Sequence, residues 1–296
     1  MEKRKAMNFG VSMNLLEGKS PEYAEKYLAG LTKDDLAKLA VVWIEIFDKF
    51  IEVVKEAGFE VIEIVAITLP LAEFRIPSFL IDELRKRISK FKEVSYHLPA
   101  GEIQISGLYK GIRKKSVEET KKHIDLCQEL KIRKVVMHPG CFSSMPKIYS
   151  LMGNITKEGA KESILEIYDH CQKNGIKLTL ENLPGSEPLF QKPEEFEPFI
   201  KEDIGLTLDT LHALTSGIDP LLFIEKFKKQ ISIVHFNDGY REELDIHYPL
   251  GSGEVDCIAV LEELKKINFE GPIILEVWSE EDLAKSREFL KKNGYF

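Results

Sequence analysis

Short runs of β-branched and apolar residues alternate with longer amphipathic stretches along the whole chain. Strands that alternate with helical stretches are typical of repeated βα units around a parallel sheet. The pattern predicts eight strands, at Asn8–Ser12, Val61–Ile67, Val94–His97, Lys134–His138, Lys177–Glu181, Gly205–Asp209, Ser232–His235 and Ile273–Val277.

Helical patterns lie between these strands. The clearest are at Ser116–Leu130, Lys157–Lys173, Pro220–Lys228, Asp256–Ile267 and Glu280–Lys291. Ser116 followed by Glu119 has the spacing of a capping box, which predicts a helix start there. Gly58 and Gly175 each follow a helical stretch, as expected of glycines that end helices. The most apolar long stretch, Val41 to Val54, is interrupted by charged residues and predicts an amphipathic helix rather than a membrane span.

Eight strands with helical partners are the content of a (β/α)8 TIM barrel, and 296 residues fall within its usual range. No break in composition marks a second domain, so residues 1–296 are interpreted as one domain. An open, doubly wound sheet is the alternative.

Composition narrows the function classes. The formal net charge of -8 argues against a broad electrostatic surface for nucleic acid. The four cysteines are scattered without a CxxC pair, which predicts neither a disulfide framework nor a thiolate zinc site. The amino terminus has no secretory pattern, so we expect a cytoplasmic protein with no membrane partner.

Potential metal ligands recur at the predicted strand ends. His97, His138, Glu181, Asp209, His235 and Glu276 lie at or next to the carboxyl ends of six strands, and three more candidates lie in the loops that follow: His212, Asp245 and His247. The carboxyl ends of all strands face one mouth in a TIM barrel, so these side chains should converge. Imidazole and carboxylate are ligands for zinc, manganese and iron. We therefore expect a divalent-metal site of one to three ions.

Six segments carry a family resemblance. They are Val135–Gly140 (VVMHPG), Leu180–Gly185 (LENLPG), Leu208–Ala213 (LDTLHA), Val234–Asp238 (VHFND), Asp245–Gly253 (DIHYPLGSG) and Ile274–Glu276 (ILE). With them the chain resembles, over nearly its whole length, the xylose-isomerase-like barrel superfamily, which includes sugar isomerases, sugar epimerases and endonuclease IV.

The resemblance to the sugar isomerases and epimerases implies one divalent metal held by Glu181, Asp209, His235 and Glu276. Glu181 and Glu276 would exchange protons with a small sugar or sugar phosphate through an enediolate. His212 and Arg241 match positions that orient substrate oxygens in this branch. Among the aromatic residues near the motifs, Tyr248 and Trp278 are the candidates for substrate contact, because each lies next to a candidate ligand.

The resemblance to endonuclease IV implies instead a three-zinc cluster for phosphodiester hydrolysis. Glu181 would bridge two metals, His97 and His138 would complete one site, and Asp209, His235 and Glu276 another. His212, Asp245 and His247 would hold the third. The chain departs from this branch where that enzyme contacts DNA, since Leu98, Pro99, Ala100 and Gly101 follow His97 in place of bulky residues.

The sequence therefore favours a divalent-metal-dependent sugar isomerase or epimerase, using zinc or manganese. An abasic-site phosphodiesterase is the alternative, and nucleic acid is an expected partner only in that case. The sequence indicates neither the oligomeric state nor the role of the segment from Leu15 to Leu36.

Overall fold

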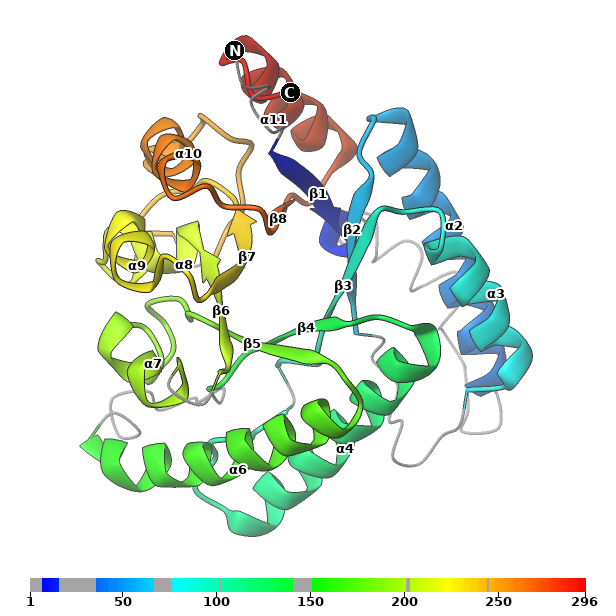
Figure 1. Ribbon diagram of the computed structural model, residues 1–296, viewed down its shortest axis with the longest axis vertical. Coiled ribbons are helices and arrows are strands. Elements are labelled where there is room, and N and C mark those ends of the chain that lie inside the picture. Colours follow the sequence, from blue (N-terminus) through cyan, green and yellow to red (C-terminus); the bar gives the residue numbers. More distant parts are fainter. Residues whose placement is uncertain are drawn as a thin grey trace.

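Eight parallel strands form a closed barrel, surrounded by helices (Figure 1). The computed structural model describes residues 7–15, 36–66, 76–101, 103–140, 151–200, 203–243 and 245–296, with side chains in the second range from residue 44. The strands are β1 (Asn8–Ser12), β2 (Val61–Val65), β3 (Glu93–His97), β4 (Lys134–Met137), β5 (Lys177–Glu181), β6 (Gly205–Asp209), β7 (Ile231–Phe236) and β8 (Pro272–Leu275).

Each strand pairs with the next in chain order, and β8 pairs with β1 to close the ring, with Gly10 opposite Ile274. This closure confirms the predicted TIM barrel and rules out the open, doubly wound sheet, which would leave two edge strands.

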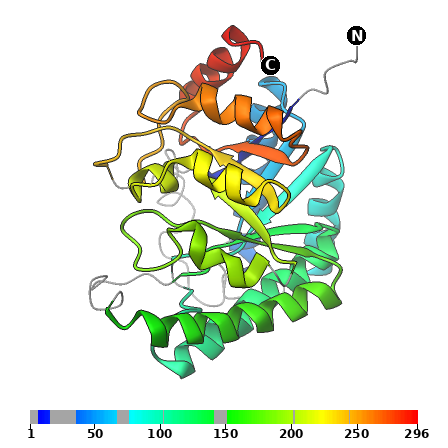
Figure 2. The ribbon, with the colours of Figure 1, turned by 60° about the vertical axis from the view of Figure 1, so that its left-hand side comes forward.

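The helices cover the outside of the barrel, as the side view in Figure 2 also shows. They are α2 (Leu36–Glu56), α3 (Ser78–Ile88), α4 (Lys110–Leu130), α6 (Gly153–Lys173), α7 (Pro193–Ile200), α8 (Thr210–Thr215), α9 (Pro220–Phe227), α10 (Cys257–Lys266) and α11 (Glu280–Lys292). The described part of the chain contains no helix with the length and apolar character needed to cross a membrane. Residues 16–35, most of the segment whose role the sequence left open, lie outside the described residues.

The predicted element ends are close to the observed ones. β1, β5 and β6 match residue for residue, and Gly58 and Gly175 follow α2 and α6 with the positive φ angles of 79° and 64° that glycine adopts readily. The predicted helix start at Ser116 is wrong, because α4 begins at Lys110. Ser116 is buried within this helix, and its hydroxyl accepts a hydrogen bond from the backbone N–H of Gln104.

The barrel interior has an apolar layer beneath a polar one. Val61, Val136, Ile233 and Ile274 form a small cluster of their own, separate from the main core. Side chains two residues apart on a strand point to the same face. The residues two positions further along therefore also face the interior, and they are Glu63, His138, His235 and Glu276.

Candidate metal centre

All nine candidate ligands lie at the carboxyl end of the barrel. His97, Glu181 and Asp209 are the last residues of β3, β5 and β6, while His138 and Glu276 directly follow β4 and β8. His235 lies in β7, His212 in the short helix α8, and Asp245 and His247 in the loop between β7 and α10.

The structure brings these nine residues together in three groups. They are His97–His138–Glu181, Glu181–Asp209–His235–Glu276 and His212–Asp245–His247. In each group one potential ligand atom from every residue lies within 4.8 Å of the others. The resemblance to endonuclease IV implied the same three groups.

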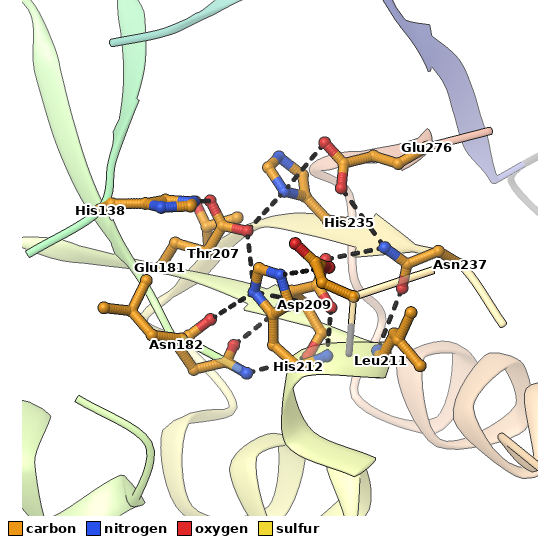
Figure 3. Close-up of polar contacts among 12 residues, drawn as sticks. His138, Glu181, Asn182, Thr207, Asp209, Leu211, His212, His235, Asn237 and Glu276 are labelled. Carbon is orange, nitrogen blue, oxygen red and sulfur yellow. Dashed lines mark hydrogen bonds and ion pairs between the residues drawn. The ribbon is translucent and has the colours of Figure 1, made fainter. Parts of the chain in front are cut away.

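Glu181 belongs to two groups because its two oxygens face different neighbours (Figure 3). Oε2 lies 3.2 Å from Nε2 of both His97 and His138. Oε1 lies 2.9 Å from Nδ1 of His235. The side chain is 1% exposed, so both oxygens are held within the protein. This arrangement is that of a carboxylate able to bridge two neighbouring cations.

Three histidines are oriented in the same way. Nδ1 of His97 lies 2.8 Å from the Leu98 carbonyl, Nδ1 of His212 lies 2.8 Å from the Asn182 carbonyl, and Nδ1 of His247 lies 3.0 Å from the Glu276 carbonyl. A carbonyl can only accept, so Nδ1 must carry the proton in each contact. Nε2 then faces the neighbouring carboxylate: Glu181 for His97, and Asp245 for His212 and His247.

His235 is oriented in the opposite sense. Its Nδ1 faces the group, 2.9 Å from Glu181 Oε1 and 3.4 Å from Glu276 Oε1. Its Nε2 points inward, 3.0 Å from Oε1 of Glu63 on β2. His235 and Glu63 are both fully buried. The inward contact is therefore made to a side chain rather than to a backbone carbonyl.

Two asparagines hold Asp209 in place. Asn237 donates from Nδ2 to Asp209 Oδ2 at 2.8 Å and to Glu276 Oε2 at 3.3 Å. Asn182 accepts from the backbone N–H of Asp209 and donates to its carbonyl. Asp209 also caps α8, because its Oδ1 accepts from the backbone N–H of His212 at 2.6 Å. The Asp209 carboxylate thus also helps to fix the position of His212.

The charges of the site shift its pKa values. Burial acts to lower the pKa of His235, but attraction to Glu181, Glu276 and Glu63 outweighs it and raises the pKa well above the usual value. Burial acts to raise the pKa of Glu181, but His235 and His138 hold it well below the usual range. Burial raises the pKa of Glu276 to about 7, with the negative charges of Glu181 and Asp209 acting in the same direction. The two glutamates therefore differ strongly in acidity.

These donors fit a divalent cation. The chemistry is right, because imidazole and carboxylate suit zinc and manganese. The orientation is also right, since metal-binding histidines almost always donate their second ring N–H to a carbonyl or carboxylate. His97, His212 and His247 meet this condition through carbonyls and His235 through Glu63. His138 and Asp245 are the most accessible of the nine, with side chains 29% and 46% exposed, so the site opens to solvent there.

The other sequence-predicted residues lie at the rim. Trp278 is 40% exposed and its ring packs edge-on against His247, with centroids 5.9 Å apart. Tyr248 packs against Tyr240 at 5.3 Å. Arg241 is exposed, and its backbone N–H donates to Glu254. Its guanidinium lies near Gly217, in the turn after the helix that carries His212.

Sequence reasoning missed four polar residues of this region: Glu63, Asn182, Asn237 and Glu187. A signal for Glu63 was present, because a glutamate two residues after Val61 in an otherwise apolar strand is unusual for a barrel interior. Asn182 and Asn237 directly follow Glu181 and Phe236 at strand ends. Glu187 lies in the loop after β5, and burial raises its pKa to about 7, with His212 and Asp245 close enough to affect it.

A closed parallel barrel with buried histidines and carboxylates at its carboxyl end defines a TIM-barrel protein with a candidate metal centre. Residues 51–293 match the family model described as xylose isomerase-like TIM barrel, and the chain belongs to this family.

The similar proteins include one named as a probable endonuclease and one named as epimerase-like. Uncharacterised protein MJ1311 of Methanocaldococcus jannaschii is 32% identical over 220 residues, which cover 71% of this chain and 72% of that protein. The "Probable endonuclease 4" of Sulfurihydrogenibium sp. is 28% identical over 192 residues, covering 58% of this chain and 67% of that protein. The crystal structure of a D-tagatose 3-epimerase-like protein superimposes with a TM-score of 0.75 at 27% identity, over 97% of this chain and 96% of that one.

Proposed function

We propose that this protein is a divalent-metal-dependent isomerase or epimerase of a small sugar or sugar phosphate. One observation carries the proposal: two buried glutamates, Glu181 of β5 and Glu276 after β8, converge on His235 at 2.9 and 3.4 Å. Epimerisation by removing a proton from one face of a sugar carbon and returning one to the other face uses two such groups. The similarity to a D-tagatose 3-epimerase-like protein over nearly the whole chain supports the same reaction class.

Glu181, Asp209, His235 and Glu276 would hold the cation. When bound, a divalent cation withdraws electron density from a sugar carbonyl and thereby acidifies the neighbouring C–H group. The remaining chemistry belongs to the protein. One glutamate removes the proton from the carbon next to the carbonyl. The other returns a proton to the enediolate. In an epimerisation it arrives at the opposite face of that carbon. In an isomerisation it arrives at the adjacent carbon, and the proton of the neighbouring hydroxyl passes to the former carbonyl oxygen.

The surroundings suit this division of roles. Glu181 and Glu276 are nearly inaccessible to solvent, at 1% and 4% exposure, so water would compete little for the transferred proton. Asn237 bonds both Asp209 and Glu276 and would keep these carboxylates in fixed positions. His212, Arg241, Tyr248 and Trp278 are the proposed substrate contacts. Glu187 joins them, because its Oε2 is buried without a hydrogen-bond partner among the described residues.

A second function is favoured by a specific observation. The groups His97–His138–Glu181 and His212–Asp245–His247 exceed what one cation requires, and together with the central group they would hold three. Three cations suit phosphodiester hydrolysis, as in endonuclease IV, because they can activate water and neutralise the phosphoryl and leaving oxygens. Nucleic acid would then be the partner. Several relatives carry the name "Probable endonuclease 4", which supports this alternative.

Metal content separates the two functions. We expect protein purified without chelator to contain one exchangeable cation per chain, with manganese or zinc restoring it after removal. Elemental analysis by mass spectrometry makes the measurement. Three tightly held zinc ions per chain would instead favour the phosphodiesterase.

Activity provides the deciding test. The protein should catalyse exchange of a carbon-bound hydrogen when ketoses and their phosphates are incubated in deuterated water, because the second glutamate returns a deuteron that it has taken from solvent between turnovers. Deuterium incorporation is followed by proton NMR, and an abasic-site oligonucleotide is incubated in parallel. Cleavage of the oligonucleotide with no deuterium in any sugar would sink the isomerase proposal.

A further inference from the structure

Glu63 is a carboxylate in the interior of the barrel. It lies at the centre of β2, directly opposite Ser95 of β3 and Ser12 of β1 in the strand register. Its exposed fraction is 0%. A buried carboxylate is costly unless it is paired and hydrogen-bonded. Its partners therefore indicate why it is there.

Both oxygens of Glu63 are directed at specific partners. Oε2 accepts a hydrogen bond of 2.8 Å from the Ser95 hydroxyl. Oε1 lies 3.0 Å from Nε2 of His235. Neither Glu63 Oε1 nor His235 Nε2 makes a hydrogen bond among the described residues, and the two atoms meet as an ion pair. The contact between Glu63 and His235 is thus the only polar contact at each of these atoms in the part of the chain that the structure describes.

This contact determines which nitrogen of His235 is free. His97, His212 and His247 donate Nδ1–H to backbone carbonyls and turn Nε2 toward the ligand groups. His235 turns Nδ1 toward Glu181 and Glu276 instead, and among the described residues no backbone carbonyl accepts a hydrogen bond from its Nε2. A cation at Nδ1 would replace the proton on that nitrogen, and the one remaining proton of the ring would then lie on Nε2, where Glu63 faces it.

We propose that Glu63 is a positioning residue: it holds the Nε2–H of His235 and so presents Nδ1 of that ring to a divalent cation. Ser95 in turn fixes the second oxygen of Glu63. The inference rests on the cation of the proposed function, but not on the substrate, because both candidate functions use His235 as a ligand.

The test measures cation affinity rather than turnover. Metal-free wild type, Glu63→Gln and Ser95→Ala are titrated with Mn²⁺ and with Zn²⁺ in competition with a fluorescent chelator. We expect Glu63→Gln to weaken binding by about 10- to 100-fold, as for other residues that orient metal-binding histidines. Ser95→Ala, which only frees Glu63 to move, should give a smaller loss in the same direction.

Glu119→Gln is the matched control. Glu119 lies 3.5 Å from Nε2 of His123, a buried histidine on α4, so the substitution also neutralises one glutamate beside a buried ring. It should leave the cation affinity unchanged. Circular dichroism checks the fold of each variant, and if Glu63→Gln does not fold, Ser95→Ala decides the question.

A second measurement, the protonation of His235, distinguishes a role of Glu63 in orienting the ring from a role in packing alone. In ¹⁵N-histidine NMR of the zinc-loaded wild type, the His235 proton should reside on Nε2, with its resonance shifted downfield by the carboxylate. This resonance should move upfield in Glu63→Gln. Unchanged affinity in Glu63→Gln and Ser95→Ala would overturn the inference alone. A wild type that binds neither cation would overturn the proposed function and the inference together.

Discussion

Glu181 and Asp209 each make contacts to several other residues of the metal centre. Glu181 faces four histidines with its two oxygens, and Asp209 both joins the central group and caps α8. Such sharing couples the groups, because a change in one side chain alters the surroundings of several others. The consequence is strongest for Glu181, since it is the residue that two of the three groups have in common.

Substitution of Glu181 by Gln should therefore lower catalysis by about 10²- to 10⁴-fold, the usual contribution of a general acid or base. The reason is that the amide can neither accept the substrate proton nor balance the charges of His235 and His138. Steady-state kinetics with the identified substrate measures the loss. Glu93→Gln, at the start of β3 and thus at the opposite end of the barrel, is the control and should retain activity. Equal rates in wild type and Glu181→Gln would remove Glu181 from catalysis.

At the scale of elements, the loop between β7 and α10 depends on one buried carboxylate. Asp238 Oδ1 accepts from the backbone N–H groups of Gly239 and Val255, and Oδ2 accepts from those of Gly251 and Gly253. A Cβ on Gly253 would lie 2.3 Å from the Gly239 carbonyl oxygen, so glycine is required for this close approach. The same loop carries Asp245 and His247, which Asp238 thus helps to place.

We expect Asp238→Asn to loosen this loop, because an amide group offers one acceptor oxygen where the carboxylate offers two. The free energy of unfolding should fall by about 3 kcal/mol, given the usual strength of hydrogen bonds to charged groups. Urea unfolding measures this change, and limited trypsin digestion should show faster cleavage after the exposed Arg241.

Asp256→Asn provides the comparison. Asp256 caps α10 with a single hydrogen bond from the backbone N–H of Ala259, at the far end of the same loop. Its variant should lose at most about 1 kcal/mol, as is typical of a cap, with no faster cleavage after Arg241. Identical digestion rates for wild type and Asp238→Asn would contradict the proposed role of Asp238 in the loop.

At the scale of the whole molecule, the centre concentrates charge inside the barrel. The pKa of His97 and that of His247 are raised to about 9, because attraction to Glu181 and to Asp245, respectively, outweighs the lowering effect of burial. The metal-free folded protein therefore holds protons that the unfolded chain has released above a pH of about 6.5. Since a cation binds neutral imidazole, metal binding must release these protons.

The melting temperature of the metal-free protein should accordingly fall as pH rises from about 6.5 to about 9. In this range the folded state binds more protons than the unfolded state, and stability then decreases with pH. With saturating Mn²⁺ the trend should reverse, because deprotonation of the imidazoles strengthens metal binding. Circular dichroism monitors thermal unfolding, and the pH dependence of the melting temperature in chelator is compared with that in Mn²⁺. A melting temperature independent of pH in chelator would show that the charges of His97 and His247 do not stabilise the folded protein.

Much of the fold and of the centre could be predicted from the sequence. The strand runs are short and regular, so their carboxyl ends could be located to within a residue or two, and the ligand types at those ends indicated a metal site. The start of α4 was mislocated because Ser116 and Glu119 have the spacing of a capping box, a local pattern that also occurs inside helices. Helix boundaries depend on which polar group meets which backbone N–H, and Ser116 meets that of Gln104 in the preceding loop.

The sequence alone determined the residue types and their phase along the strands, because alternation on a strand is a local property. Only the tertiary structure decided which nitrogen of each histidine faces its group. The orientation of the rings depends on carbonyls and carboxylates brought near by other strands, and Glu63 reaches His235 from β2 to β7 across the barrel interior. Such contacts exist only once the barrel closes, so no local pattern encodes them.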